Sequence, residues 1–323
     1  MKFFTRIPTQ AFIAVLAATG LGACGGGSEN AEGFASVNPS PPSPLPPAPP
    51  PPPPPPPSPP PPAASPQGYN LVWSEEFNGN ALSSKCWSYW WNPTNTPNEM
   101  QAYTSNQKNT VVKDGMLNLA AHKENVTAQG KTYSYSSSQI YSGGKGMWTY
   151  GRFEARIRIP KGAGVWPAFW LLPQDNFYGG WPLNGEIDIV EWIGPKPRVV
   201  YNTVHGPGPG GSGHASTTKE YTAAADVGDD FHTYGLEWTP TGMKYFFDGA
   251  QINEITTWPQ PTGAAFPAPF DRPFYIVLNL GIGGDWPGPP DANTVFPSTM
   301  LVDWVRVYQK STTSTAAPAS SCS

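Results

Sequence analysis

The chain has 323 residues, with 19 Lys and Arg against 23 Asp and Glu and a formal net charge of -4. This length suggests one large domain or two small ones. The acidic balance and the lack of a basic cluster argue against nucleic acid as a partner.

The first residues have the composition of an export signal. Lys2 and Arg6 precede an apolar run from Ala11 to Ala23 that is too short to span a membrane and is built like a secretory signal. The run ends in "LGAC", which is similar to the lipobox where bacterial lipoprotein signals are cut before a cysteine. Residues 1–23 are therefore predicted to be a lipoprotein-type signal peptide, with Cys24 lipidated. An ordinary signal peptide would leave Cys24 incidental.

Residues 24–67 are predicted to be a disordered proline-rich linker. From Pro39 to Pro66 the chain is almost all proline with scattered Ser and Ala, so it cannot bury a core. A polyproline II segment of this kind acts as a semi-rigid stalk. Together with Cys24 it predicts an exported lipoprotein of the cell envelope, at the outer membrane or the cell surface, and otherwise a secreted protein.

Residues 68–310 are predicted to form one all-β domain. Short alternating runs between turn residues dominate, as in "GRFEARIRIP" and "MLVDWVRVYQ", and no long stretch repeats hydrophobic residues at the helical spacing. The pattern predicts a sandwich of two antiparallel sheets. Residues 311–323 are predicted to be a flexible tail. Cys86 and Cys322 can pair in an oxidising compartment, but the place of Cys322 in that tail leaves the pairing open.

Three carboxylates stand within six residues of "NGEIDIVEWIG". In a regular strand Glu186 and Asp188 share a face and Glu191 points the other way. A β-bulge at Ile189 and Val190 would return Glu191 to the same face. Retaining glycoside hydrolysis needs two such acids, one ionised as nucleophile and one protonated as general acid. A solvated strand face and a cation site are the alternatives.

Two further features favour a carbohydrate cleft. Tryptophans surround the acids, and indole faces stack on the C–H faces of sugars, although a sandwich also buries aromatic residues. Trp166 and Trp181 lie beside Gly and Pro in loop-like sequence, so they are candidates for substrate binding. In "GRFEARIRIP" the polar face carries Arg152 and Glu154, which form either a solvated surface or a set of hydroxyl-binding groups in the cleft.

The chain resembles glycoside hydrolase family 16, and within it the laminarinase-like endo-1,3-β-glucanases. The resemblance covers nearly the whole predicted domain and is densest around the acids. Its motifs are "LVWSEEFNG", "NEMQAYTSNQKNTVVKDGMLNLAA", "YGRFEARIRIP", "GVWPAFWLLP", "WPLNGEIDIVEWIG", "NTVHGPGPGGSG", "DDFHTYGLEWTP", "VLNLGIGGDWPG" and "MLVDWVRVYQ". In this order, the E-x-D-x-x-E triplet is specific to the family.

The resemblance implies a β-jelly roll with a concave substrate cleft and a reaction that retains anomeric configuration. It implies Glu186 as the nucleophile, Asp188 as the acid that assists it and Glu191 as the general acid/base. The residues that it matches to the cleft are Trp166, Trp286, His205, Asn98 and Glu99.

The resemblance also implies a structural calcium ion on the convex side. The matching residues are Glu76, the main-chain carbonyl of Gly115 and Asp303, and hard oxygen ligands suit calcium. The common "DEF" of relatives reads "EEF" here, at Glu75 and Glu76. No cofactor is expected for catalysis.

The predicted function is endo-acting hydrolysis of β-1,3-glucan by a monomer. The bulged triplet is shared with agarases and carrageenases, so it does not name the sugar. The segments "GVWPAFWLLP", "HGPG" and "GGDWPG" look more like laminarinases. The alternatives are a mixed-linkage β-1,3-1,4-glucanase, then an agarase or carrageenase type of hydrolase, a transglycosylase, and a non-hydrolytic glucan-binding protein.

Overall fold

A computed structural model describes residues 66–90, 93–96, 98–310 and 320–322. The elements that these residues form are all strands. Within these ranges no helix is long and apolar enough to cross a membrane. The predicted signal peptide, Cys24 and all but the last two residues of the predicted linker lie outside the described residues.

The strands form two sheets, and the larger has eleven strands. Its pairing is antiparallel except for β3 with β6 and β1 with β19. The main path runs in the order β16 (Ala250–Ile255), β15 (Gly242–Phe247), β14 (His232–Thr239), β9 (Gly151–Arg158), β18 (Ser298–Lys310), β5 (Met116–Ala128), β6 (Lys131–Ser137) and β3 (Gln101–Tyr103), with β1 (Tyr69–Glu75), β19 (Ser320–Ser321) and β4 (Thr110–Lys113) attached to it.

The second sheet has eight strands and is antiparallel throughout. Its order is β13 (Ala215–Thr222), β12 (Val199–Gly206), β11 (Glu186–Glu191), β10 (Val165–Pro173), β17 (Phe274–Ile282), β7 (Gln139–Tyr141) and β2 (Ser88–Tyr89), and β8 (Met147–Trp148) pairs with β17.

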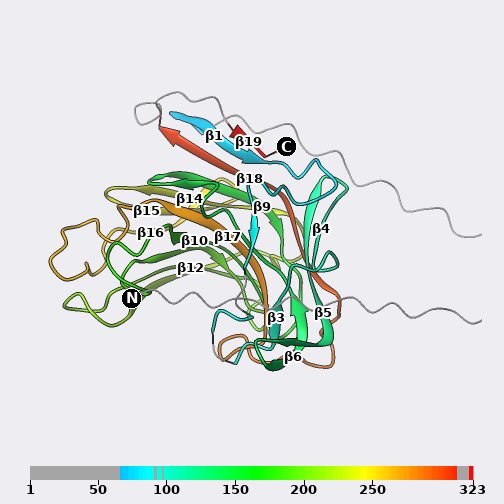
Figure 1. Ribbon diagram of the computed structural model, residues 1–323. Helices are drawn as coiled ribbons and strands as arrows, with labels where there is room; N and C mark the ends of the chain where they lie inside the picture. Colours follow the sequence, from blue (N-terminus) through cyan, green and yellow to red (C-terminus); the bar gives the residue numbers. More distant parts are fainter. Residues whose placement is uncertain (1–65, 91–92, 97, 311–319, 323) are drawn as a thin grey trace, which may run out of the picture. The chain divides into compact units, whose positions relative to one another are not determined.

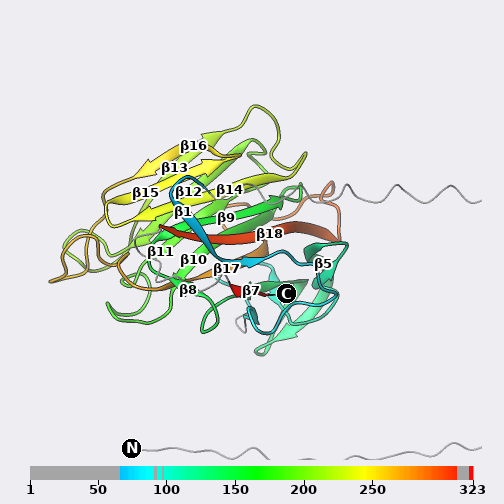
Figure 2. The same ribbon diagram turned by 90° about the horizontal axis from the view of Figure 1, so that it is seen from above.

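The two sheets pack face to face as a sandwich, which confirms the predicted fold class. Figure 1 shows β18, β9 and β14 in one layer and β10, β17 and β12 in the other, and Figure 2 shows these layers from above. Alternate residues fill the space between them: on β9 these are Phe153, Ala155 and Ile157, and on β17 they are Phe274 and Ile276, all fully buried. The remaining residues of each strand therefore face outward.

The C-terminal residues differ from the predicted flexible tail. Ser320–Ser321 form β19, which pairs in parallel with β1, and the Cys322 N–H donates to the Ser74 carbonyl at 3.2 Å. Cys322 is buried and forms a disulfide with Cys86. The flexible-tail prediction is thus wrong for 320–322, because the disulfide and the strand pairing hold this end against β1. Residues 311–319 and 323 of that prediction lie outside the described residues.

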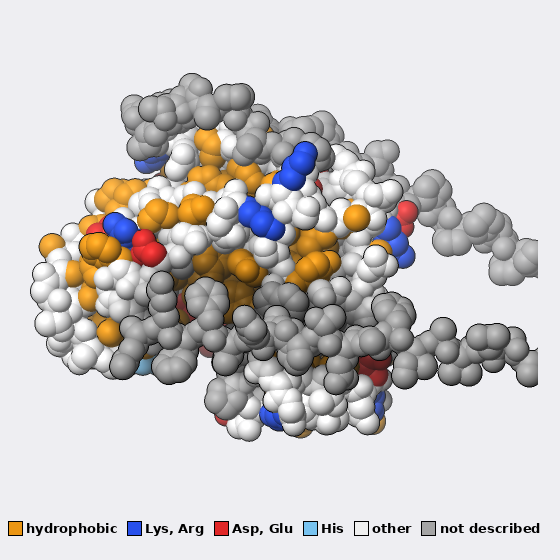
Figure 3. All heavy atoms as spheres, in the orientation of Figure 1, with side chains coloured by type: hydrophobic (Ala, Val, Ile, Leu, Met, Phe, Trp, Pro, Cys, Tyr) orange, Lys and Arg blue, Asp and Glu red, His pale blue; other side chains and the backbone are white. Residues whose placement is uncertain are grey.

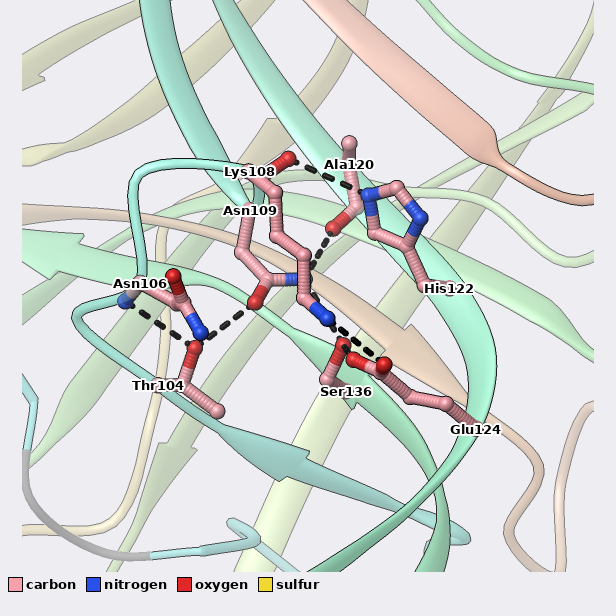
Figure 4. Close-up of polar contacts among 8 residues, drawn as sticks. All are labelled: Thr104, Asn106, Lys108, Asn109, Ala120, His122, Glu124 and Ser136. Atoms are coloured by element: carbon pink, nitrogen blue, oxygen red, sulfur yellow. Dashed lines mark hydrogen bonds and ion pairs between the residues drawn. The ribbon is translucent and has the colours of Figure 1, made fainter. Parts of the chain in front are cut away.

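A buried asparagine, Asn109, links the residue after β3 to strands β5 and β6 (Figure 4). The Asn109 amide donates to the Ala120 carbonyl at 2.8 Å and to Ser136 Oγ at 3.0 Å, and its oxygen accepts from Thr104 Oγ1 at 2.7 Å. Asn109 is fully buried. Thr104 directly follows β3, so this network holds the end of β3 in place. The loop at residues 98–100 directly precedes β3.

Charged side chains on the surface occur in small groups among polar and hydrophobic ones on the face drawn in Figure 3. Many of them are paired, for example Lys108 with Glu124 at 2.6 Å and Arg272 with Asp175 at 3.0 Å. Exposed pairs of this kind contribute little to stability. The fold therefore depends mainly on the apolar core between the sheets.

Candidate functional site

The acid triplet lies on β11 with the bulge that the sequence requires. On one side Glu186 pairs with His205 and Glu191 with Tyr201, and the register shifts between Asp188 and Glu191. On the other side the register of β10 with β11 shifts at the same place. The extra residue leaves both Ile189 and Val190 in the core, each 1% exposed. The predicted bulge is confirmed, and it brings Glu191 to the face of Glu186.

That face is the outer surface of the eight-stranded sheet, and it carries a cleft of about 690 Å³. Glu186 and Glu191 line the cleft, and Asp188 lies below it in an adjoining recess of about 70 Å³. Aromatic side chains form much of the wall: Trp90, Trp166, Trp170, Trp181, Tyr275 and Trp286. The structure thus brings Trp166, Trp181, Trp286 and His205 to the acids, as the sequence predicts.

Each glutamate accepts a hydrogen bond from an indole. Trp181 Nε1 donates to Glu186 Oε2 at 2.7 Å, and Trp166 Nε1 donates to Glu191 Oε1 at 3.1 Å. Trp181 comes from the loop between β10 and β11, whereas Trp166 stands on β10. An N–H donor favours the ionised carboxylate. The two tryptophans therefore stabilise the ionised forms of Glu186 and Glu191 as well as forming the cleft wall.

From β12, His205 faces the carboxyl groups of Asp188 and Glu186. Its Nε2 lies 3.3 Å from Asp188 Oδ2 and 4.0 Å from Glu186 Oε1. Among the described residues, no group makes a well-directed hydrogen bond to Asp188 Oδ2, although that atom is buried. His205 is therefore the group best placed to satisfy it.

The electrostatics of the triplet favour protonated acids. Burial raises the pKa of Glu186, Asp188 and Glu191 above the usual range, and the charge of Asp188 raises those of both glutamates further. For Glu191 the two effects raise the pKa to about 8. His205 and the Trp181 N–H act in the opposite direction on Glu186. The pKa of Glu186 is raised to the same value, about 8, and for each glutamate His205 and one indole N–H act to lower the pKa.

The predicted cleft residues Asn98 and Glu99 have different positions. Glu99 is 4% exposed and lines the small recess beside Asp188. It accepts from the backbone N–H groups of Asn95 at 3.2 Å and Thr96 at 3.0 Å. Asn95 and Thr96 themselves line the cleft, so Glu99 holds the loop that borders it. Asn98 is exposed and donates to Asp285 Oδ1 at 2.9 Å. It does not line the cleft.

The prediction that Arg152 and Glu154 offer hydroxyl-binding groups in the cleft is wrong. They stand on β9, which pairs with β14 and β18 in the eleven-stranded sheet. Because Phe153 points to the core, its neighbours point to the outer face of that sheet, away from the eight-stranded sheet. There Arg152 Nε donates to Glu154 Oε1 at 2.7 Å.

The predicted calcium ligands are engaged by arginines. Glu76 accepts from Arg306 with both oxygens, at 2.9 and 2.8 Å, and Asp303 Oδ2 accepts from Arg156 Nη1 at 2.7 Å. Gly115 lies in the turn between β4 and β5. A calcium ion would need these two guanidinium groups to move away from the carboxylates, so the calcium site stays a prediction.

Sequence reasoning missed His214 and Asn279. His214 lines the cleft and meets His205 Nδ1 through its Nε2 at 2.9 Å. Asn279 accepts from Trp170 Nε1 at 2.7 Å under the cleft. The one signal for His214 is its place at the end of the glycine-rich hairpin that follows His205. Pairing puts Ser216 opposite His205, so His214 is a diagonal neighbour of His205 on the same face.

A family model described as "Glycosyl hydrolases family 16" matches residues 98–306. That span contains the bulged triplet, both indole donors and His205.

Similar proteins include a glucan endo-1,3-beta-glucosidase A1 of Niallia circulans, 35% identical over 75% of this chain and 38% of the relative. A beta-glucanase of Rhodothermus marinus is 38% identical over 75% of this chain and 85% of the relative. A solved catalytic domain of an endo-1,3-beta-glucanase (laminarinase) from Thermotoga petrophila is 35% identical, with a TM-score of 0.67 over 75% of this chain and 98% of that one.

Proposed function

Because the chain belongs to glycosyl hydrolase family 16, we propose that it is a retaining, endo-acting hydrolase of β-1,3-glucan. The observation that carries this proposal is the bulge on β11, which places Glu186 and Glu191 on one face with Asp188 between them. A retaining mechanism needs two carboxyl groups on one face at the scissile bond. The relatives named as endo-1,3-β-glucanases support the choice of glucan.

The residues have distinct roles in this reaction. Glu191 is protonated and gives its proton to the leaving glycosidic oxygen, while ionised Glu186 attacks the anomeric carbon and forms a glycosyl-enzyme. Water then attacks the same carbon, and Glu191, now ionised, takes a proton from it. The Trp181 N–H stabilises the charge of Glu186 before attack. Asp188, buried next to Glu186, raises the pKa of both glutamates and so helps to keep Glu191 protonated.

The aromatic wall suits a glucan chain. Trp181 and Trp286 are 55% and 40% exposed, which is unusual for side chains of this size. Trp286 meets Trp166 and Tyr201 edge-on, with ring centroids 5.5 and 4.7 Å apart. Flat apolar faces next to the acids bind the C–H faces of sugar rings and exclude water from them.

The test has two parts. Sugar release from laminarin, lichenan, agarose and carrageenan identifies the linkage, and product sizes distinguish hydrolysis from transfer, since transfer yields chains longer than the starting oligosaccharide. Glu186→Gln should lose activity by at least about 10³-fold and still bind laminarin, because the amide keeps the shape and loses the nucleophile. Unchanged hydrolysis by that variant, or release from agarose alone, would contradict the proposal.

We also propose that the protein is exported and held at the cell envelope through lipidated Cys24. The signal-like residues 1–23 and the lipobox support this location. So does the disulfide between Cys86 and Cys322, since disulfides persist in oxidising compartments. Cys24→Ser in the full chain should move the protein from the detergent-extracted membrane fraction to the soluble exported fraction. Retention in the membrane fraction would contradict lipid anchoring at Cys24.

A further inference from the structure

The hairpin between β12 and β13 places a second imidazole against His205. His214 Nε2 lies 2.9 Å from His205 Nδ1, and the two rings are nearly parallel, at 14° with centroids 5.2 Å apart. The glycine-rich loop leading to His214 is tightly held. Its Gly208 N–H donates to the Ser212 carbonyl at 2.9 Å, and a Cβ on Gly211 would lie 2.4 Å from the backbone nitrogen of Thr262. His214 therefore has a fixed approach to His205.

His214 also packs against the other side chain that reaches Glu186. Its ring centroid is 5.0 Å from that of Trp181, whose Nε1 donates to Glu186. Trp181 and His205 approach Glu186 from the loop before β11 and from β12. His214 thus touches both of them and lies behind them, relative to the carboxyl groups.

The contact between the imidazoles couples the protonation of His205 Nδ1 to that of His214 Nε2, because one of the two nitrogens must donate and the other accept. In a neutral imidazole one nitrogen donates and the other accepts, and the partner of one nitrogen decides the state of the other. Asp188 Oδ2, 3.3 Å from His205 Nε2, is buried and needs a donor. If His214 Nε2–H donates to Nδ1, the proton of neutral His205 stays on Nε2 and faces Asp188. If His205 is charged, Nδ1–H donates to neutral His214 and Nε2–H again faces Asp188.

We propose that His214 is a positioning residue for hydrolysis, which holds the ring and the tautomer of His205 so that Nε2–H is directed at Asp188. The proposal rests on the function proposed above, because its kinetic effect is read through glucan hydrolysis. Burial and the neighbouring His205 lower the pKa of His214, which helps to keep it neutral and able to fill either hydrogen-bonding role. Loss of the contact leaves His205 free to take the tautomer whose bare Nε2 faces the Asp188 carboxylate, and the hydrogen bond from His205 toward Asp188, next to Glu186, is lost.

Two substitutions separate hydrogen bonding from packing. Glutamine keeps a donor and an acceptor within reach of His205 Nδ1, whereas phenylalanine keeps a ring between His205 and Trp181 but has no polar atom. We expect His214→Phe to lower kcat on laminarin by about 10-fold with KM within about 2-fold, and His214→Gln to recover most of that loss. His122→Phe, on β5 of the eleven-stranded sheet, controls for the general effect of the exchange, because His122 does not line the cleft.

Kinetics alone can overturn the proposal. If Phe and Gln are equally active, hydrogen bonding by His214 has no role. If His214→Phe raises KM and leaves kcat unchanged, His214 binds sugar rather than positioning His205. Loss of kcat in His214→Gln with kcat of His214→Phe unchanged would assign the effect to ring packing on Trp181.

A spectroscopic measurement tests the tautomer without substrate. The chain has 4 histidines, so long-range proton–nitrogen NMR of the imidazole rings is tractable, and single substitutions assign the signals. His205 should carry its proton on Nε2 in the parent protein, and its Nδ1 signal should move toward that of a nitrogen without a hydrogen bond in His214→Phe. A proton on Nδ1 with bare Nε2, or no change in His214→Phe, would overturn the proposal. Failure to hydrolyse laminarin by the parent protein would instead contradict the proposed function.

Discussion

Removing one indole donor should move one limb of the pH profile and leave the other in place. Trp181 donates to Glu186, which must be ionised to attack, so activity rises as pH passes the pKa of Glu186. Trp166 donates to Glu191, which must be protonated, so activity falls as pH passes the pKa of Glu191. Each donor lowers the pKa of its glutamate. Trp181→Phe should therefore move the acidic limb to higher pH, and Trp166→Phe should move the alkaline limb to higher pH.

The size of the shift follows from the hydrogen bond and its exposure. A hydrogen bond to a charged group contributes about 1.5–3 kcal/mol, and about 1.4 kcal/mol corresponds to one pKa unit. The Glu186 side chain is 16% exposed, so water replaces part of the lost donor and the lower end applies. We expect a shift of about one pH unit, equal to about 10-fold in kcat/KM at a pH well below the acidic limb.

The assay is the pH dependence of kcat/KM on laminarin for both variants. Trp286→Phe is the matched control, because Trp286 contacts Trp166 and Tyr201 by its ring and makes no hydrogen bond to an acid within the described part of the chain. It should change KM and leave both limbs in place. A uniform loss at all pH values in Trp181→Phe, or movement of the same limb by both donor variants, would refute the assignment of nucleophile and acid.

Four further changes test other parts of the structure. Asn109→Ala should lower the free energy of unfolding by about 2 kcal/mol in urea titrations, since it leaves buried partners without hydrogen bonds; no loss would mean that water replaces the amide. Asp188→Asn should raise stability at neutral pH. The folded state raises the pKa of Asp188, so above pH 3.8 the folded chain binds more protons than the unfolded chain. The free energy of unfolding of the parent protein therefore falls as pH rises above 3.8. The stability gain of the variant should vanish near about pH 3, and a gain that persists there would have another cause. Cys322→Ser should cost about 4 kcal/mol, because the disulfide closes a loop across a separation of 236 residues, and reduced parent protein should unfold at the same urea concentration as the variant. Arg152→Ala should leave kcat and KM for laminarin within about 2-fold, because its partner is Glu154 on the outer face of the other sheet; a large rise in KM would contradict that placement.

The bulge was predictable from the sequence because a regular strand would place Glu191 on the opposite face from Glu186. The side-chain period of a strand is two, so Glu191 and Glu186 can share a face only if one residue is added between them. Ile189 and Val190 are both apolar and can both be buried, which identifies where the extra residue lies. Local sequence contained both the conflict and its solution.

The placement of Arg152 and Glu154 was not predictable in the same way. Alternation on β9 correctly separates a core face from an outer face, but both sheets of a sandwich have an outer face. Which of them carries the cleft depends on strand pairing far apart in sequence, here β9 with β14 and β18. The position of Glu99 has a similar cause, since Glu99 forms an isolated β-bridge with Gly283, which is distant in the sequence.

The contrast between local and distant sequence also applies to the stability of the site. Local sequence places three acids on one strand, and distant parts of the chain supply the groups that stabilise their ionised forms. Burying three acids on one strand raises the pKa of each, so their ionisation opposes folding. The groups that offset this cost come from three other places in the chain: an indole from β10, an indole from the loop before β11, and an imidazole from β12 that is itself held by His214. The triplet alone indicates the chemistry, but each glutamate also depends on an indole donor that lies outside β11. A change in a donor should therefore redistribute protons within the triplet before it weakens the fold, because the core beneath it, including Ile189 and Val190, is untouched.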